Sequence, residues 1–159
     1  MKRNTAVLFL IAFMGLSLRA QSNRSAFDNA VATARIHSFT EILRNSGIPI
    51  EDLRNGDVTL IIPVDTSFYK LTKEQYSQLL LSQDKDLSEK YIRSHMLSGR
   101  LSLKELVEGP HKTIGGIEIK ATPAANGAPA TINGHRVFQA EISGTHGIVY
   151  LIEGFLFQP

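Results

Sequence analysis

The chain contains no cysteine. This absence excludes disulfide bonds, zinc sites built from thiolates, a cysteine nucleophile and the lipid-bearing cysteine of a bacterial lipoprotein. The folded chain must therefore be held together by its hydrophobic core. With 159 residues, of which 43% are hydrophobic and 20% are charged, the sequence is long enough for one such core and has the composition of a globular domain.

A strong net charge is also absent. The formal net charge of the whole chain is +2, but Lys2, Arg3 and Arg19 lie within the first 20 residues, and without them 14 basic residues face 15 acidic ones. No cluster of lysine and arginine interleaved with aromatic residues remains after residue 20. Nucleic acid is therefore not an expected partner.

The sequence has no apolar run long enough for a membrane span. Its longest such stretch, residues 6–18, holds 13 residues, whereas a spanning helix needs about 20. Lys2 and Arg3 precede the stretch and the small residue Ala20 follows it, which is the layout of a signal peptide. We predict a signal peptide over residues 1–20, no permanent membrane span, and a secreted or periplasmic, cell-envelope location.

Catalytic and metal-binding motifs are missing as well. The sequence has neither a Gly-x-Ser-x-Gly nor a His-Glu-x-x-His pattern, and residues 109–113 lack the glycine that a phosphate-binding loop needs before Lys112. Residues 84–95 imitate the start of a calcium loop, but Glu89 stands where that loop requires glycine. None of the five histidines is followed by another four residues later. The sequence therefore predicts no catalytic residue, no cofactor and no metal site.

The first half of the mature chain has the pattern of helices. Apolar residues at helical spacing predict two consecutive helices over residues 27–45, the second capped by Ser38 together with Glu41 and ended by Gly47. Two further capping boxes are expected, in which Thr72 pairs with Gln75 and Ser102 with Glu105.

Strands flank these helices along the sequence. Residues 57–64 form a nearly continuous apolar run, which indicates a strand buried on both faces, and Asp65 or Thr66 is expected to cap the short helix that follows. Gly115-Gly116 and Asn133-Gly134 suit two-residue hairpin turns, residues 121–129 form a loop, and residues 148–157 read as a final buried strand or strand pair. We expect one α+β domain over residues 21–159, with N-terminal helices packed on an antiparallel β-sandwich or wedge.

Three segments in series carry a family resemblance. They are Val58-Thr59-Leu60-Ile61-Ile62-Pro63-Val64-Asp65-Thr66-Ser67-Phe68, Tyr91-Ile92-Arg93-Ser94-His95-Met96-Leu97-Ser98-Gly99, and His146-Gly147-Ile148-Val149-Tyr150-Leu151-Ile152-Glu153. Together they resemble the motifs of the fasciclin, or FAS1, domain family, except that His146, Tyr150 and Glu153 replace an asparagine, a histidine and an aspartate. The resemblance implies a FAS1-like fold and six signature residues with structural roles: Pro63, Asp65, Phe68, His95, Gly147 and Tyr150.

Two of these residues allow a more detailed expectation. His95 is a lone imidazole on an apolar helical face, and we predict that it forms a hydrogen bond within the Asp65 turn, as the matching positions do in the family. Tyr150 is expected to pack in the core with its hydroxyl at the rim.

The resemblance also implies a function. The family contains adhesion and matrix modules of animals and plants, and small secreted or envelope proteins of bacteria, which this chain resembles more. It implies a binding module that mediates adhesion or an extracellular protein or polysaccharide interaction without catalysis. Integrin binding is not implied, because Ala140-Glu141-Ile142 does not reproduce the Asp-Ile core of integrin-contact motifs. An alternative is a small-ligand binder or hydrolase with a pocket near His95, His146 and Tyr150.

Overall fold

The computed structural model describes residues 23–82 and 84–158. The predicted signal peptide, residues 1–20, lies outside the described residues. The helices are α1 (Ala26–Thr33), α2 (His37–Ser46), α3 (Ile50–Asn55), α4 (Asp65–Phe68), α5 (Lys73–Tyr76), the π-helix η1 (Ser77–Leu81), α6 (Lys85–Arg93) and α7 (Leu103–Glu108). The strands are β1 (Val58–Pro63), β2 (Met96–Ser98), β3 (His111–Lys112), β4 (Glu118–Ile119), β5 (Ala121–Thr122), β6 (Thr131–Ile132), β7 (His135–Ser143) and β8 (Ile148–Ile152).

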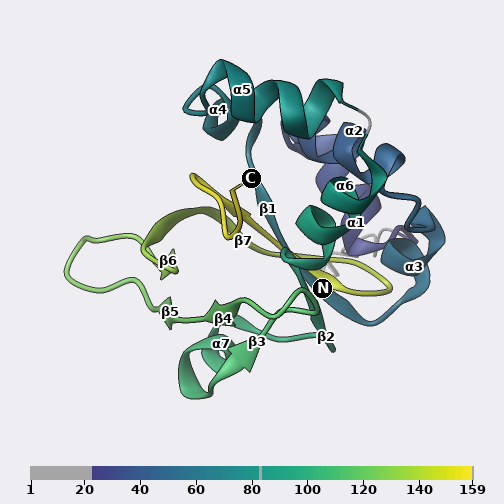
Figure 1. Cartoon of the computed structure of the whole chain (residues 1–159). Coiled ribbons are helices and arrows are strands. Elements are labelled where there is room, and N and C mark those ends of the chain that lie inside the picture. Colours follow the sequence, from purple (N-terminus) through teal and green to yellow (C-terminus); the bar gives the residue numbers. More distant parts are fainter. Residues whose placement is uncertain (1–22, 83, 159) are drawn as a thin grey trace, which may run out of the picture.

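A six-stranded sheet in the order β2-β1-β8-β7-β6-β5 organises the molecule, and β3 and β4 form a separate pair (Figure 1). The α+β class is confirmed. The expectation that all strands are antiparallel is wrong for one pair, because β1 and β8 run parallel, with Leu60 beside Val149. A parallel pair requires a long connection between its strands, and here most of the chain lies between β1 and β8.

Both faces of this sheet are covered, as the apolar run of β1 predicted. Leu60 and Ile62 belong to a cluster with the helices, which we call the helix-side core, and Ile61 points into a second cluster, the far-side core. The residues of β8 alternate in the same way, because successive side chains of a strand point to opposite faces. Helices α1, α2 and α6 lie over one face, and α7 with the β3–β4 pair lies on the other (Figure 1).

Several local signals are confirmed. Both predicted capping boxes are present, at α5 and α7. Gly47 ends α2 in the left-handed conformation, with φ 72°. Asn133 and Gly134 both have positive φ and form a two-residue turn between Ile132 and His135.

Two local predictions are wrong. Gly115 and Gly116 do not form a two-residue hairpin turn. The Thr113 N–H donates to Ile117 O, so residues 114–116 all lie in the turn, and only Gly116 among them has a positive φ. Helix α2 begins at His37 without a side-chain cap from its own flank. Ser38 lies inside this helix, and its expected partner Glu41 forms an ion pair with Arg44 instead.

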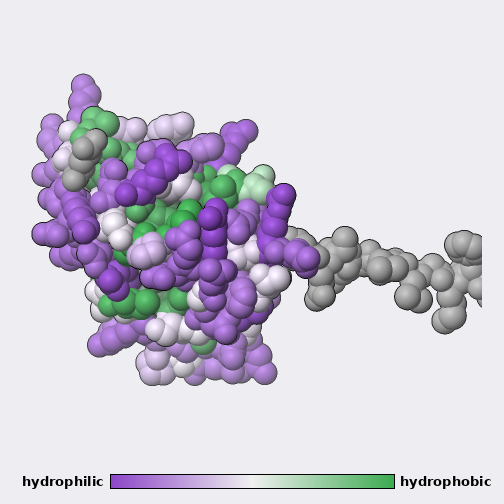
Figure 2. Space-filling view, turned by 90° about the vertical axis from the view of Figure 1, so that its right-hand side faces the viewer, coloured by the Kyte–Doolittle hydropathy of each residue, from purple (hydrophilic) through white to green (hydrophobic). Residues whose placement is uncertain are grey.

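The molecular surface is mostly hydrophilic on the side that carries α3 and α6. Figure 2 shows hydrophobic residues there as separate areas between hydrophilic ones. In the part of the chain that the structure describes, no helix is both long enough and apolar enough to cross a membrane.

Candidate functional site

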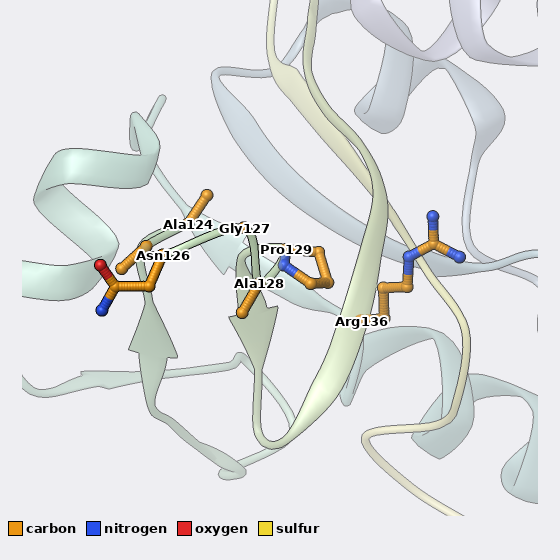
Figure 3. Close-up of a pocket in the computed structure, with 7 residues that line it drawn as sticks. Ala124, Asn126, Gly127, Ala128, Pro129 and Arg136 are labelled. Carbon is orange, nitrogen blue, oxygen red and sulfur yellow. The ribbon is translucent and has the colours of Figure 1, made fainter.

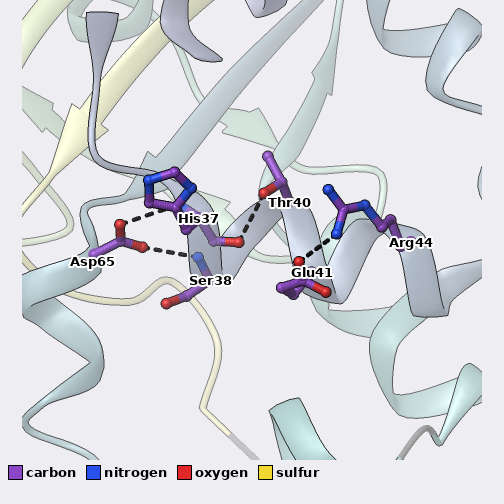
Figure 4. A network of polar contacts seen from close by, with 6 residues as sticks. All are labelled: His37, Ser38, Thr40, Glu41, Arg44 and Asp65. Carbon is purple, nitrogen blue, oxygen red and sulfur yellow. Dashed lines mark hydrogen bonds and ion pairs between the residues drawn. The ribbon is translucent and has the colours of Figure 1, made fainter. Parts of the chain in front are cut away.

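Asp65 caps a helix from a distant segment of the chain (Figure 4). Its Oδ2 accepts the His37 N–H at 3.1 Å, and its Oδ1 accepts the Ser38 N–H at 2.8 Å. These N–H groups open α2 and lie at the positive end of the helix dipole, so the carboxylate satisfies donors that the helix leaves unpaired. The prediction that Asp65 caps the helix following it is wrong, because α4 has no side-chain cap. Asp65 instead joins the β1–α4 turn to α2.

His95 is fully buried just beyond the end of α6. Its Nδ1 lies 2.9 Å from Tyr91 O, and its Nε2 accepts the Leu156 N–H at 3.3 Å, which fits a neutral imidazole protonated on Nδ1. Burial is the main cause that lowers the pKa of His95 from 6.5 to about 4. The predicted hydrogen bond within the Asp65 turn is wrong, because His95 joins α6 to the segment after β8.

Tyr150 is buried in β8, and its hydroxyl donates to Leu101 O at 2.9 Å. Burial, followed by the nearby carboxylates of Glu141 and Glu105, raises the pKa of Tyr150 above the range of an ordinary tyrosine. The phenol is therefore neutral at physiological pH and is already bonded, so it is a poor nucleophile.

The three residues of the alternative pocket do not meet. His95 packs edge-on against Phe39 of the helix-side core at a ring distance of 6.3 Å, whereas Tyr150 belongs to the far-side core. His146 is exposed at the surface, with Nδ1 3.9 Å from Asp57 Oδ1. The expectation of a pocket formed by His95, His146 and Tyr150 is therefore wrong.

The other signature residues also lie within the fold. Pro63 ends β1 beside Ile152, and the ring of Phe68 meets that of Phe155 at 5.0 Å. Gly147 has φ 71°, and a Cβ at this position would lie 3.0 Å from Val58 O. Close approach and positive φ together explain a glycine in the turn before β8.

The structure places a cavity elsewhere, between the end of α1 and the outer part of β7. We call it the α1–β7 cavity; its volume is about 490 Å³. Ala34, Val64 and the Phe138 ring contribute apolar surface, and Phe138 is 57% exposed. The other lining residues are polar: Thr33, Arg35, Asp65, Thr66, Gln139 and Glu153.

The sequence of β7 explains why an aromatic ring lies exposed here. Val137 pairs with Ile152 and Gln139 with Leu151, so Phe138 is an extra residue in a β-bulge. A bulge redirects the side chains around it and is common beside binding sites. Neither Phe138 nor Arg35 was predicted as a site residue. The available signal was the aromatic Phe138 directly beside the apolar Val137, which breaks the alternation of apolar and polar residues in a strand. That alternation alone does not locate a bulge.

Two other hollows have less to offer a ligand. One, of about 750 Å³, lies along residues 124–129 and Arg136. The Arg136 guanidinium points away from this loop (Figure 3) and pairs with Glu153 at 3.2 Å. The other, of about 300 Å³, lies between α3, α6 and Ile114, and its Arg93 pairs with Glu89 at 2.8 Å.

No group of three or more His, Asp or Glu side chains that could hold a metal ion occurs among residues 23–82 and 84–158. The α1–β7 cavity offers an aromatic face, a guanidinium group, two carboxylates, hydroxyls and an amide.

Comparisons with known proteins identify the fold and the family. The chain is similar to a FAS1 domain pair from the insect cell adhesion molecule fasciclin I, with a TM-score of 0.67 and 18% sequence identity. This match covers 80% of the chain and 49% of the domain pair, so the chain spans about half the length of that structure. A search of curated proteins finds no match. The model of the fasciclin domain matches residues 34–159, and the chain therefore belongs to the fasciclin domain family.

Proposed function

We propose that this chain is a secreted or cell-envelope binding module, which mediates adhesion or contacts an extracellular protein or polysaccharide without catalysis. The observation that carries this proposal is that the polar signature side chains are engaged in hydrogen bonds within the fold. Asp65, His95 and Tyr150 each form a hydrogen bond with a backbone group of a distant segment of the chain. Groups engaged in this way are not free to attack a substrate or to transfer a proton to it. Contact with a partner is left to the exposed surface.

The family and the export signal support the same proposal. Fasciclin domains are known in adhesion-related proteins, and the similar structure comes from an insect cell adhesion molecule. A signal peptide over residues 1–20 would bring the domain to the compartment where such contacts are made.

The test is a retention experiment with envelope material. The mature chain, residues 21–159, is immobilised, and labelled cell envelopes of the source organism are passed over it. We expect saturable retention and no release of soluble fragments with time, because binding without catalysis leaves the envelope intact. A column carrying the same chain after heat unfolding is the control.

Two results would contradict the proposal. Fragments that accumulate in the eluate in proportion to the amount of folded chain would show hydrolysis. Equal retention by the folded and the unfolded column would show that no folded surface is recognised.

A further inference from the structure

We propose that the α1–β7 cavity binds an acidic polysaccharide, with the Phe138 ring against the sugar and Arg35 against its carboxylate. This inference rests on the proposed function and names the class of partner. The cavity volume of about 490 Å³ lies within the usual range of ligand sites, roughly 300 to 1,000 Å³.

The cavity lining holds one arginine, Arg35, and two carboxylates, Asp65 and Glu153, and the arginine is the group that can take an anionic ligand. Both oxygens of Asp65 accept backbone N–H groups, and Glu153 pairs with Arg136, so these carboxylates already have partners. Arg35 lines the cavity, is exposed and forms no ion pair with any residue that the structure describes. A guanidinium group in this situation matches a carboxylate, which it can hold by two parallel hydrogen bonds.

The remaining lining matches a sugar better than an apolar peptide side chain. A sugar ring has an apolar C–H face and a rim of hydroxyls. Phe138 offers a half-exposed ring for the face, and Thr66 and Gln139 offer groups that both donate and accept hydrogen bonds. The Thr33 hydroxyl donates to Asn29 O and is left as an acceptor. Peptide anchors instead need closed, fully desolvated apolar pockets.

The test uses defined oligosaccharides and the mature chain. Binding of tetragalacturonate, of neutral maltotetraose and of short polyglutamate is measured by calorimetry at low salt, where charge interactions are least screened. We expect saturable binding of tetragalacturonate only. Arg35→Gln and Phe138→Ser should each weaken it by about tenfold or more, because each removes a central contact.

Matched variants control for charge and for exposed aromatic area. Arg44→Gln removes another exposed arginine, on α2, and Tyr69→Ser removes a ring that is 83% exposed; neither residue lines the cavity. Both should change the affinity by less than about twofold, since surface substitutions away from a site have small effects. Thermal unfolding of every variant confirms that the fold is kept.

Several results would overturn the inference. If tetragalacturonate does not bind, or if Arg44→Gln weakens it as much as Arg35→Gln, the cavity is not an acidic-sugar site. Equal binding of maltotetraose would remove the role of Arg35, and tighter binding of polyglutamate would make the ligand an acidic peptide. Envelope retention without tetragalacturonate binding would overturn only this inference and leave the proposed function standing.

Discussion

The imidazole of His95 couples the titration of one residue to the stability of the whole domain. In the folded chain its pKa is lowered from 6.5 to about 4, chiefly by burial. Between these two pH values the unfolded chain binds a proton that the folded chain does not. The contribution of His95 to the free energy of unfolding is therefore fully present above about pH 6.5. It is lost as the pH falls toward 4, and below that pH this residue causes no further loss.

We expect His95 to account for about 3 kcal/mol of lost unfolding free energy between pH 6.5 and 4, because each unit of pKa difference corresponds to about 1.4 kcal/mol. Urea unfolding followed by circular dichroism at a series of pH values measures this loss. His95→Gln serves as the control, since carboxylates titrate in both proteins while only the wild type has this imidazole. Parallel pH profiles of the two proteins would show that His95 is not the group responsible.

Single residues also show what the sequence could and could not predict. The capping boxes at Thr72 and Ser102 were predictable because each involves residues three positions apart. The cap of α2 was not predictable, because Asp65 lies 27 positions away from Ser38. A local sequence pattern does not show which distant residues the fold brings together. The partner of His95 was missed for the same reason, since Leu156 lies 61 positions away.

Among the elements, the β3–β4 hairpin depends on close contact with the end of α6. The Gly115 N–H donates to Arg93 O at 2.8 Å, and the Ile114 N–H donates to Met96 O at 2.7 Å. The first bond uses the carbonyl of the last residue of α6, which has no partner inside the helix, and the second uses a carbonyl of β2. A Cβ on Gly115 would lie 2.6 Å from the backbone nitrogen of Ser94. Gly115 is therefore required for space, whereas Gly116 has φ 87° and nothing near its missing Cβ.

This contrast predicts opposite tolerance of asparagine at neighbouring positions. Gly115→Asn should lower the unfolding free energy by about 1 to 3 kcal/mol, the usual effect of overpacking. Gly116→Asn should have a much smaller effect, because asparagine tolerates the left-handed conformation well. Urea unfolding of the two variants side by side tests the prediction. A larger loss at Gly116 than at Gly115 would contradict the proposed contact.

The outer part of β7 shows how the irregular geometry of an expected strand can escape prediction. Two register shifts separate Val137, Gln139 and Ile142, and between the last two Glu141 has φ 52°. Its carboxylate accepts the Leu103 N–H at the start of α7 at 2.8 Å. A strand was expected to begin near His135, but alternation of apolar residues reveals neither the bulges nor the exposed ring of Phe138. The candidate cavity is therefore visible only in three dimensions.

For the whole molecule, the start of the described chain is fastened to the turn between β7 and β8. The Ala26 N–H donates to His146 O at 2.9 Å, and the Thr145 N–H donates to Arg24 O at 3.0 Å. Gly144 packs directly on this segment, since a Cβ there would lie 2.4 Å from Ala26 N. The chain is thus bonded to this turn at Arg24 and Ala26, only a few positions beyond the expected cleavage site after Ala20.

Export is the prediction at this scale. When the full chain is expressed in the source organism, we expect a protein outside the cytoplasm that begins at Gln21, because residues 1–20 have the layout of a signal peptide. Mass spectrometry of the N-terminal peptide in each cell fraction provides the measurement. A Leu10→Arg variant, which interrupts the apolar stretch, should accumulate inside the cell with Met1 retained. Membrane-bound protein that still begins at Met1 would indicate an anchor instead.

The position of β8 in the sheet has a consequence for how the protein is made. β8 lies between β1 and β7 and contributes residues to both cores, yet it is the last strand of the described chain to leave the ribosome. Until it emerges, the helices already synthesised have no completed sheet on which to pack. Pairing between segments so far apart in sequence is slow, because a long loop must close first. We therefore expect the nascent polypeptide to complete its core only late in synthesis, a delay that would suit the export proposed above.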